Sequence, residues 1–209
     1  MNNHYILMGD IIDSSSKEGG MLMENFKSIV KDVNDKHKSV IISPLTITLG
    51  DEFQGVIKDL NSAIDILFYL DKRILGNEVF YNMRYVINYG LIDTPINKEN
   101  AYEMLGKGLT DARIRLNSLK KSHIKVHIDG VEDKLRMKLN SAFRLYQSIY
   151  DGIREKDRRL AYEFSEGADY KTLAKKFGKD DSSMWRKKQS LKIEDYLTSR
   201  KLIKMIADE

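Results

Sequence analysis

The chain contains no cysteine and only two prolines among its 209 residues. The lack of cysteine excludes disulfide bonds and thiolate metal sites. No apolar run approaches the ~18–20 residues that a membrane-spanning helix requires. The first residues contain neither the basic segment nor the small-residue cleavage site of a signal peptide. We therefore expect a cytoplasmic protein with a regular fold and no membrane partner.

Charge is distributed unevenly along the chain. Residues 1–131 contain 16 lysines and arginines against 17 acidic residues, whereas residues 132–209 contain 19 against 14. A basic C-terminal third indicates a nucleic-acid partner, although solubility alone could explain it.

Apolar periodicity divides the chain into two parts. The first part is expected to alternate strands (4–10, 44–49, 53–57, 83–92 and 124–128) with helices (20–37, 61–75 with Asn61 as the cap, and 105–119). This order predicts an α/β (α+β) fold, a ferredoxin-like or palm domain with an antiparallel sheet and helices. The second part shows only helical periodicity, over 133–150, 154–165, 170–177, 181–190 and 192–206. We therefore predict a palm domain over 1–131 and an all-α domain over 132–209.

Two short acidic motifs mark the ends of apolar runs, Gly-Asp-Ile-Ile-Asp at 9–13 and Gly-Asp-Glu-Phe at 50–53. Two strands that each bring a carboxylate to one place form a site for a hard cation, and Mg²⁺ is commonly held by one or two carboxylates together with substrate phosphates. Asp10 and Asp51 are the predicted metal ligands, with Asp51 at the tip of a hairpin. Strand alternation turns Asp13 away from Asp10, and Glu52 away from the neighbouring Asp51. The alternative is that both motifs are ordinary Gly-Asp turns.

The segments 5–14 and 48–55, which contain these motifs, resemble the SatD family of bacterial proteins. They also resemble the palm catalytic domain of class III nucleotidyl cyclases and GGDEF diguanylate cyclases, in which one metal aspartate follows the first strand and another lies in a Gly-Asp hairpin. The likeness continues through 84–90 and through 102–106, where Glu103 matches the acid that reads the purine. The resemblance implies a nucleotide site, for which the expected residues are Ile11, Glu52, Glu103, Lys107 and Arg113.

The sequence departs from the cyclase pattern at three functional positions. Ile47 stands where a base-reading lysine is usual, Thr110 where an asparagine orients the ribose, and Ile114 where an arginine stabilises the transition state. The cations that could replace this arginine are Arg113, Arg115 and Lys107, although a shift of one residue turns a side chain by ~100° around a helix. In the segment Gly106–Gly108, backbone N–H groups could cradle a phosphate, or the glycines could simply open the helix.

Residues 170–190 have the form of a helix-turn-helix and resemble those of bacterial regulators. Ala174 would let two helices approach closely, Gly178 would allow the turn, and Asp180 or Asp181 would cap the second helix. The expected DNA contacts lie on that second helix, at Ser182, Ser183, Arg186, Lys187 and Lys188. The alternative is a helical hairpin with a solvated basic face. Trp185 is expected in the core.

These features predict a DNA-binding regulator whose palm domain binds a nucleotide and Mg²⁺. An active Mg²⁺-dependent nucleotidyl cyclase or transferase that uses Asp10 and Asp51 is the first alternative, with the tail serving only to form a homodimer. A degenerate palm that serves protein contacts is the second.

Overall fold

The computed structural model describes residues 2–14 and 19–209. Its strands are β1 (Asn2–Ile11), β2 (Ile41–Ile47), β3 (Glu52–Ile57), β4 (Met83–Ile92) and β5 (Val126–Asp129). Its longer helices are α1 (Gly19–Lys36), α2 (Leu60–Leu75), α3 (Lys107–Leu119), α4 (Asp133–Asp151), α5 (Arg158–Ser165), α6 (Tyr170–Lys176), α7 (Asp181–Ser190) and α8 (Ile193–Ala207). The predicted order of strands and helices is confirmed, as is the mixed α/β class. Within the described ranges, no helix has both the length and the apolar character needed to cross a membrane.

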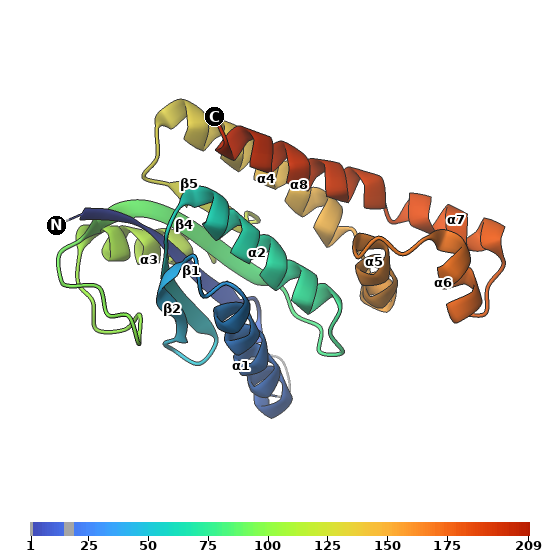
Figure 1. Cartoon of the computed structure of the whole chain (residues 1–209), viewed down its shortest axis with the longest axis horizontal. Coiled ribbons are helices and arrows are strands. Elements are labelled where there is room, and N and C mark those ends of the chain that lie inside the picture. The colour runs from blue at the N-terminus through green and yellow to red at the C-terminus, as the bar shows by residue number, and fades with distance from the viewer. Residues whose placement is uncertain (1, 15–18) are drawn as a thin grey trace.

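The strands of the described residues form one sheet in the order β2-β3-β1-β4-β5 (Figure 1). All neighbours are antiparallel except β4 and β5, which run parallel. The predicted hairpin of β2 and β3 is confirmed, with Gly50 in a left-handed conformation at its turn (φ 84°). In the register of the sheet, Asp10 on the central strand β1 lies opposite Glu52 on one side and Arg84 on the other.

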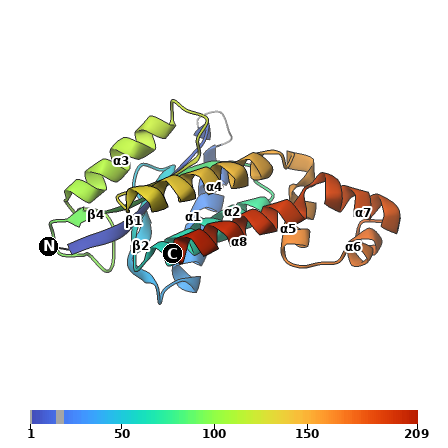
Figure 2. The ribbon, with the colours of Figure 1, turned by 90° about the horizontal axis from the view of Figure 1, so that it is seen from above.

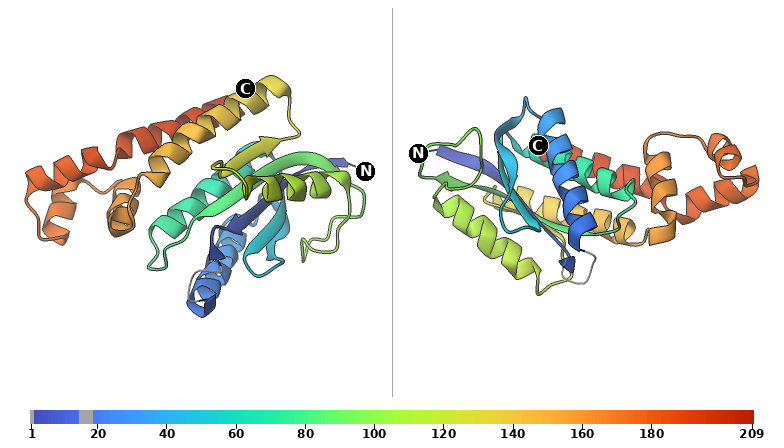
Figure 3. Two further views of the ribbon diagram at one scale, coloured as in Figure 1. Left: turned by 180° about the vertical axis from the view of Figure 1, so that it is seen from behind. Right: turned by 90° about the horizontal axis from the view of Figure 1, so that it is seen from below.

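Helices cover both faces of the sheet, which explains why residues 6–11 of β1 are all buried. On one face, Ile6, Met8 and Val86 pack against apolar residues of α3. On the other face, Leu7 and Ile87 belong to a larger core shared with α1, α2, α4 and α8. Figure 3 shows the helices around the sheet from two further sides.

The C-terminal helices share this larger core with the sheet. Helices α4 and α8 run side by side in the views of Figures 1 and 2, and both contribute to the core that includes α2. Asp71 of α2 accepts hydrogen bonds from Tyr85 of β4 (2.8 Å) and Tyr146 of α4 (2.7 Å). A separate all-α domain is therefore not shown, and the boundary at 131/132 stays a prediction.

Two local predictions about side chains are wrong. Helix α2 is capped by Asp59, whose side chain accepts from the backbone N–H of Ser62, and Asn61 lies inside the helix. Trp185 is not a core residue, since half of its surface is exposed, and the neighbouring Met184 is fully buried instead. Of the two predicted caps of α7, Asp180 is the one observed, since its side chain accepts a hydrogen bond from the N–H of Ser183.

Candidate functional site

The two predicted metal aspartates lie at the same end of the sheet. Asp10 is the penultimate residue of β1 and is 2% exposed. Asp51 lies in the turn between β2 and β3, and its carbonyl oxygen accepts a hydrogen bond from the N–H of Ile11 at 2.9 Å. Its carboxylate accepts another from Ser14 Oγ at 2.6 Å. The backbone bond ties the tip of the hairpin to the end of β1.

Three cations surround Asp10 and its sheet neighbour Glu52. Asp10 Oδ2 lies 3.2 Å from Arg84 Nη1 and 3.4 Å from Lys120 Nζ. Glu52 Oε2 lies 2.8 Å from Arg113 Nη1, and Glu52 Oε1 lies 3.0 Å from the same Lys120 Nζ. Lys120 therefore bridges the two carboxylates. Together with Asp51 at the same end of the sheet, the site holds three acidic and three basic side chains.

Burial sets the electrostatics of this cluster. Desolvation raises the pKa of Asp10, an effect that Arg84 and Lys120 oppose and that the charge of Glu52 reinforces. For Lys120, desolvation alone would lower the pKa of the ammonium group, but its hydrogen bond to Glu52 and the charge of Asp10 raise it. Lys120 thus remains a cation at neutral pH.

The described residues at the sheet end form no complete metal site, but they include one buried carboxylate oxygen without a partner. The described residues contain no cluster of three or more histidine, cysteine, aspartate or glutamate side chains that could hold a metal on their own. However, Asp10 Oδ1 is buried and has no hydrogen-bond partner among the described residues. A buried carboxylate oxygen of this kind is expected to find a partner, and a hard cation is a suitable one. Asp10 and Asp51 would hold such an ion, with water and ligand oxygens completing its coordination.

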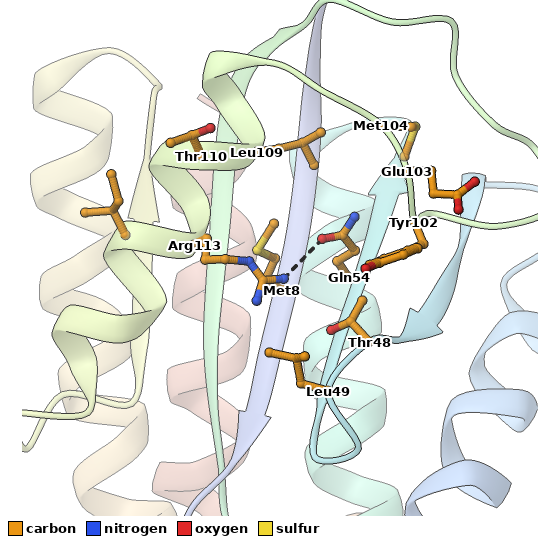
Figure 4. A pocket seen from close by; sticks show the side chains of 11 residues that line it. Met8, Thr48, Leu49, Gln54, Tyr102, Glu103, Met104, Leu109, Thr110 and Arg113 are labelled. Atoms are coloured by element: carbon orange, nitrogen blue, oxygen red, sulfur yellow. Dashed lines mark hydrogen bonds between the residues drawn. The ribbon is translucent and has the colours of Figure 1, made fainter.

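A pocket of about 460 Å³ lies beside the ion cluster (Figure 4). Its walls come from β1, the β2–β3 hairpin, the loop before α3, and α3 itself. The lining residues are Met8, Thr48, Leu49, Gln54, Tyr102, Glu103, Met104, Leu109, Thr110, Arg113 and Ile114. Arg113 belongs to both structures, because it donates to Glu52 in the ion cluster and to Gln54 in the pocket wall (3.4 Å, dashed in Figure 4). The pocket and the ion cluster therefore form one continuous site.

The pocket offers specific polar groups to a ligand. Glu103 is exposed in the wall of the pocket and has a left-handed backbone (φ 63°). Thr48 Oγ1 is buried and has no hydrogen-bond partner in the described part of the chain. The loop carrying Glu103 is fastened to the hairpin, since the N–H of Ala101 donates to Thr46 Oγ1 at 2.9 Å and Gln54 Nε2 donates to the carbonyl of Ala101.

Close backbone packing places α3 against β4. A Cβ atom on Gly108 would lie 2.5 Å from the carbonyl carbon of Gly90, and one on Gly106 would lie 2.4 Å from the carbonyl oxygen of Leu91. Glycine at these positions lets the helix start approach the strand, and Asn88 Nδ2 secures it by donating to the carbonyl of Gly108 at 2.9 Å. The glycines thus have a packing role, and the phosphate cradle predicted here stays a prediction.

Three other residues predicted from the sequence, Ile11, Lys107 and Arg115, do not contribute their side chains to the ion cluster or the pocket. The side chain of Ile11 points into the core on the opposite face of the sheet, so only its backbone faces Asp51. Lys107 is exposed and pairs with Asp111 at 2.6 Å, and Arg115 pairs with Asp129 at 2.8 Å. The sequence did not predict a role in the site for five residues, Arg84, Lys120, Gln54, Thr48 and Tyr102. Four of them lie in the segments 48–55, 84–90 and 102–106 that resemble cyclases, and that position is the signal that could have found them, whereas Lys120 lies outside these segments.

The predicted DNA contacts lie on α7, at the end of the molecule opposite the N-terminus (Figure 1). Ala174 is fully buried and Gly178 adopts φ 60° at the turn, as predicted. The basic side chains of α7 have partners within the chain, since Lys187 lies 2.7 Å from Asp157 and Lys188 lies 2.6 Å from Glu194. The other three predicted DNA contacts form hydrogen bonds within α7 and its cap. Ser182 and Ser183 donate to Asp180, and Arg186 donates to Ser182. The helix-turn-helix interpretation is not confirmed.

Solved structures with similar folds include three nucleotide cyclases. They are an adenylate cyclase from Trypanosoma brucei in its monomeric state (TM-score 0.45, 54% of this chain and 66% of that chain), a bacterial light-regulated adenylyl cyclase (0.44, 61% and 75%), and the guanylate cyclase domain of RhGC from Catenaria anguillulae in complex with GTP (0.43, 61% and 78%). Each is 14% identical to this chain, and the first match spans slightly less than two thirds of its relative.

Sequence comparison identifies the family directly. No curated protein matches the chain. The sequence profile of the SatD family matches residues 4–206, which is nearly the whole chain. The chain therefore belongs to the SatD family.

Proposed function

We propose that this protein binds a nucleoside triphosphate together with Mg²⁺ and acts as a nucleotidyl cyclase or transferase. The proposal rests above all on Arg113, which joins a pocket of suitable size to an ion cluster that contains three cations. A nucleoside triphosphate has two parts that match the pocket and the ion cluster, an uncharged base and a polyanionic phosphate chain.

Each part of the site has a role in this proposal. The base would occupy the pocket, where Glu103 can accept hydrogen bonds and Thr48 Oγ1 needs a partner. The phosphates would lie toward Arg113, whose planar guanidinium suits phosphate oxygens. Asp10 and Asp51 would hold the metal ion, which supplies phosphate polarisation and a lower pKa for the attacking hydroxyl group.

Arg113 would also stabilise the charge that develops during phosphoryl transfer. Ile114 occupies the position of the arginine that resembling cyclases use, and it is largely exposed at the rim of the pocket. The side chain of Arg113 is directed instead toward Glu52 and Gln54. A cation held by two acceptors needs little reorganisation when the charge develops, which is the requirement for electrostatic stabilisation.

The test combines binding and turnover. Isothermal titration of ATP, GTP, CTP and UTP, with and without Mg²⁺, should find at least one nucleotide whose binding requires the metal. Asp51→Asn should remove the metal dependence, and Arg113→Ala should weaken binding at least 10-fold, about the worth of one charge-assisted hydrogen bond. Arg115→Ala is the matched control, because this arginine lies on the same helix but pairs with Asp129.

Turnover of the bound nucleotide is followed by chromatography. A cyclic or transferred nucleotide product that disappears in Asp51→Asn supports the enzyme. The absence of metal-dependent binding for all four nucleotides would refute the proposal as a whole.

A second candidate, DNA-binding regulation, rests on the local geometry of α6 and α7. The buried Ala174, the left-handed Gly178 and the cap at Asp180 give the two helices the turn that such motifs use, and Arg186 is exposed. If this candidate is right, the protein binds duplex DNA in a salt-dependent manner and Arg186→Ala reduces the affinity. Arg144→Ala, an exposed arginine on α4, is the control. Equal affinity of the two variants would refute it.

A further inference from the structure

Lys120 lies where a cation between two carboxylates would be expected. Its Nζ atom is 3.0 Å from Glu52 Oε1 and 3.4 Å from Asp10 Oδ2, and both acids are almost completely buried. Lys120 reaches this place from the end of α3, where its backbone terminates the helix. Its side chain is partly exposed, so the charged group enters the site from the solvent side.

The ammonium group engages the carboxylate oxygens that a second metal ion would need. Glu52 Oε1 and Asp10 Oδ2 are both bonded to Lys120, Glu52 Oε2 is bonded to Arg113, and Asp10 Oδ2 also meets Arg84. Of the four oxygens of these two acids, only Asp10 Oδ1 has no partner among the described residues. A further divalent ion between Asp10 and Glu52 would therefore meet the Lys120 ammonium group and the guanidinium groups of Arg84 and Arg113, which repel it.

We propose that Lys120 acts as a built-in cation that takes the place of a second divalent ion. This inference deepens the proposed function and rests on it for the nucleotide, but not for the metal. The site would then accept one divalent ion, at Asp10 Oδ1 and Asp51, and would bind it together with the phosphates of the nucleotide. An ammonium group has three N–H donors. Two of them point at Glu52 and Asp10, which leaves the third for a phosphate oxygen.

The decisive experiment measures metal binding without any nucleotide. Mn²⁺ is titrated into wild-type protein, Lys120→Ala and Lys121→Ala, and free Mn²⁺ is followed by electron paramagnetic resonance. Removing the ammonium group releases Glu52 Oε1 and lowers the local charge. We therefore expect Lys120→Ala to bind one more Mn²⁺ per chain than the wild type, or to bind it at least 10-fold more tightly. Lys121→Ala removes an exposed neighbouring lysine and should behave like the wild type.

A second variant tests whether a gain in Mn²⁺ binding comes from the loss of the positive charge or from damage to the structure. Lys120→Arg keeps a cation at the same place, so it should gain no Mn²⁺, whereas a gain in Lys120→Arg equal to that in Lys120→Ala would overturn the proposal. Identical Mn²⁺ binding by wild type and Lys120→Ala would also overturn it.

A titration with nucleotide present distinguishes a failure of the role of Lys120 from a failure of the proposed function. Mn²⁺ is titrated in the presence of whichever of the four nucleotides the wild type binds. One protein-dependent Mn²⁺ per bound nucleotide supports the role of Lys120. Two such ions in the wild type would refute the role of Lys120 while leaving the proposed function intact. If none of the four nucleotides binds, the proposed function loses its support, and the metal titration of Lys120→Ala still decides whether Lys120 replaces a second divalent ion.

Discussion

The burial of the Asp71 carboxyl group predicts a stability that depends on pH. This carboxylate is buried in α2 and accepts from the hydroxyl groups of Tyr85 and Tyr146, while Tyr150 donates to its backbone carbonyl at 3.1 Å. Burial raises the pKa of Asp71 from 3.8 to about 6, although the two tyrosine hydrogen bonds favour the charged form. The folded protein therefore holds this proton to a higher pH than the unfolded chain does.

The sign of the effect follows from proton linkage. Because the folded pKa lies above the unfolded one, the folded state binds more protons between the two values, and stability falls as the pH rises through that range. A difference of about two pKa units corresponds to about 3 kcal/mol in full. Between about pH 7.5 and pH 5, roughly half of this, ~1.5 kcal/mol, should be recovered.

The assay compares urea unfolding of the wild type and Asp71→Asn at these two pH values. Asparagine has a similar shape but does not titrate, so the difference in unfolding free energy between the two proteins isolates Asp71. We expect the wild type to gain about 1.5 kcal/mol relative to Asp71→Asn on going to the lower pH. Asp65→Asn, an exposed position on the same helix, should follow the wild type. A difference between wild type and Asp71→Asn that does not change with pH would refute the reasoning.

Three further predictions concern positions that shape the fold around the site. Gly108→Ala should lower the free energy of unfolding by about 1–3 kcal/mol in urea, because the new Cβ would meet the backbone of Gly90; an unchanged midpoint would contradict the close packing of α3. Asp59→Ala should lower the unfolding free energy by about 1 kcal/mol through loss of the α2 cap, and Asn61→Ala by less than half of that. The fluorescence of Trp185, the single tryptophan, should be readily quenched by iodide, and strong protection would show that this side chain is buried.

Most of the fold could be predicted because its signals are local. Strand β4 begins and ends at the predicted residues, and the helix expected over 20–37 is α1 (Gly19–Lys36). The wrong predictions of the α2 cap and of the buried residue on α7 arose where two residues close in the sequence suit the same role. Asp59 and Asn61 can both cap a helix, and the choice depends on where the helix begins. Met184 and Trp185 are both apolar, and a step of one residue turns the side chain by ~100°.

Only part of the site could be predicted in the same way. Asp10 and Asp51 stand out because each follows an apolar run, and Arg113 stands beside the position of an expected arginine. Lys120 has no such signal, since it lies 68 residues from Glu52 along the chain and meets it only through the packing of α3 on the sheet. Lys120 bridges Asp10 and Glu52 only because α3 packs on the sheet, and the periodicity of apolar residues does not predict such a contact.

The burial of Asp10 connects the stability of the sheet to its chemistry. An ionised carboxylate buried near the end of the central strand is tolerated only when cations compensate it, and Arg84 and Lys120 provide this compensation. With Glu52, Asp51 and Arg113, the site holds three acidic and three basic side chains. A divalent ion alone would make this site positive, whereas a bound polyphosphate would offset the added charge. The residues that allow Asp10 to be buried therefore also couple the entry of a metal ion to the arrival of its anionic ligand.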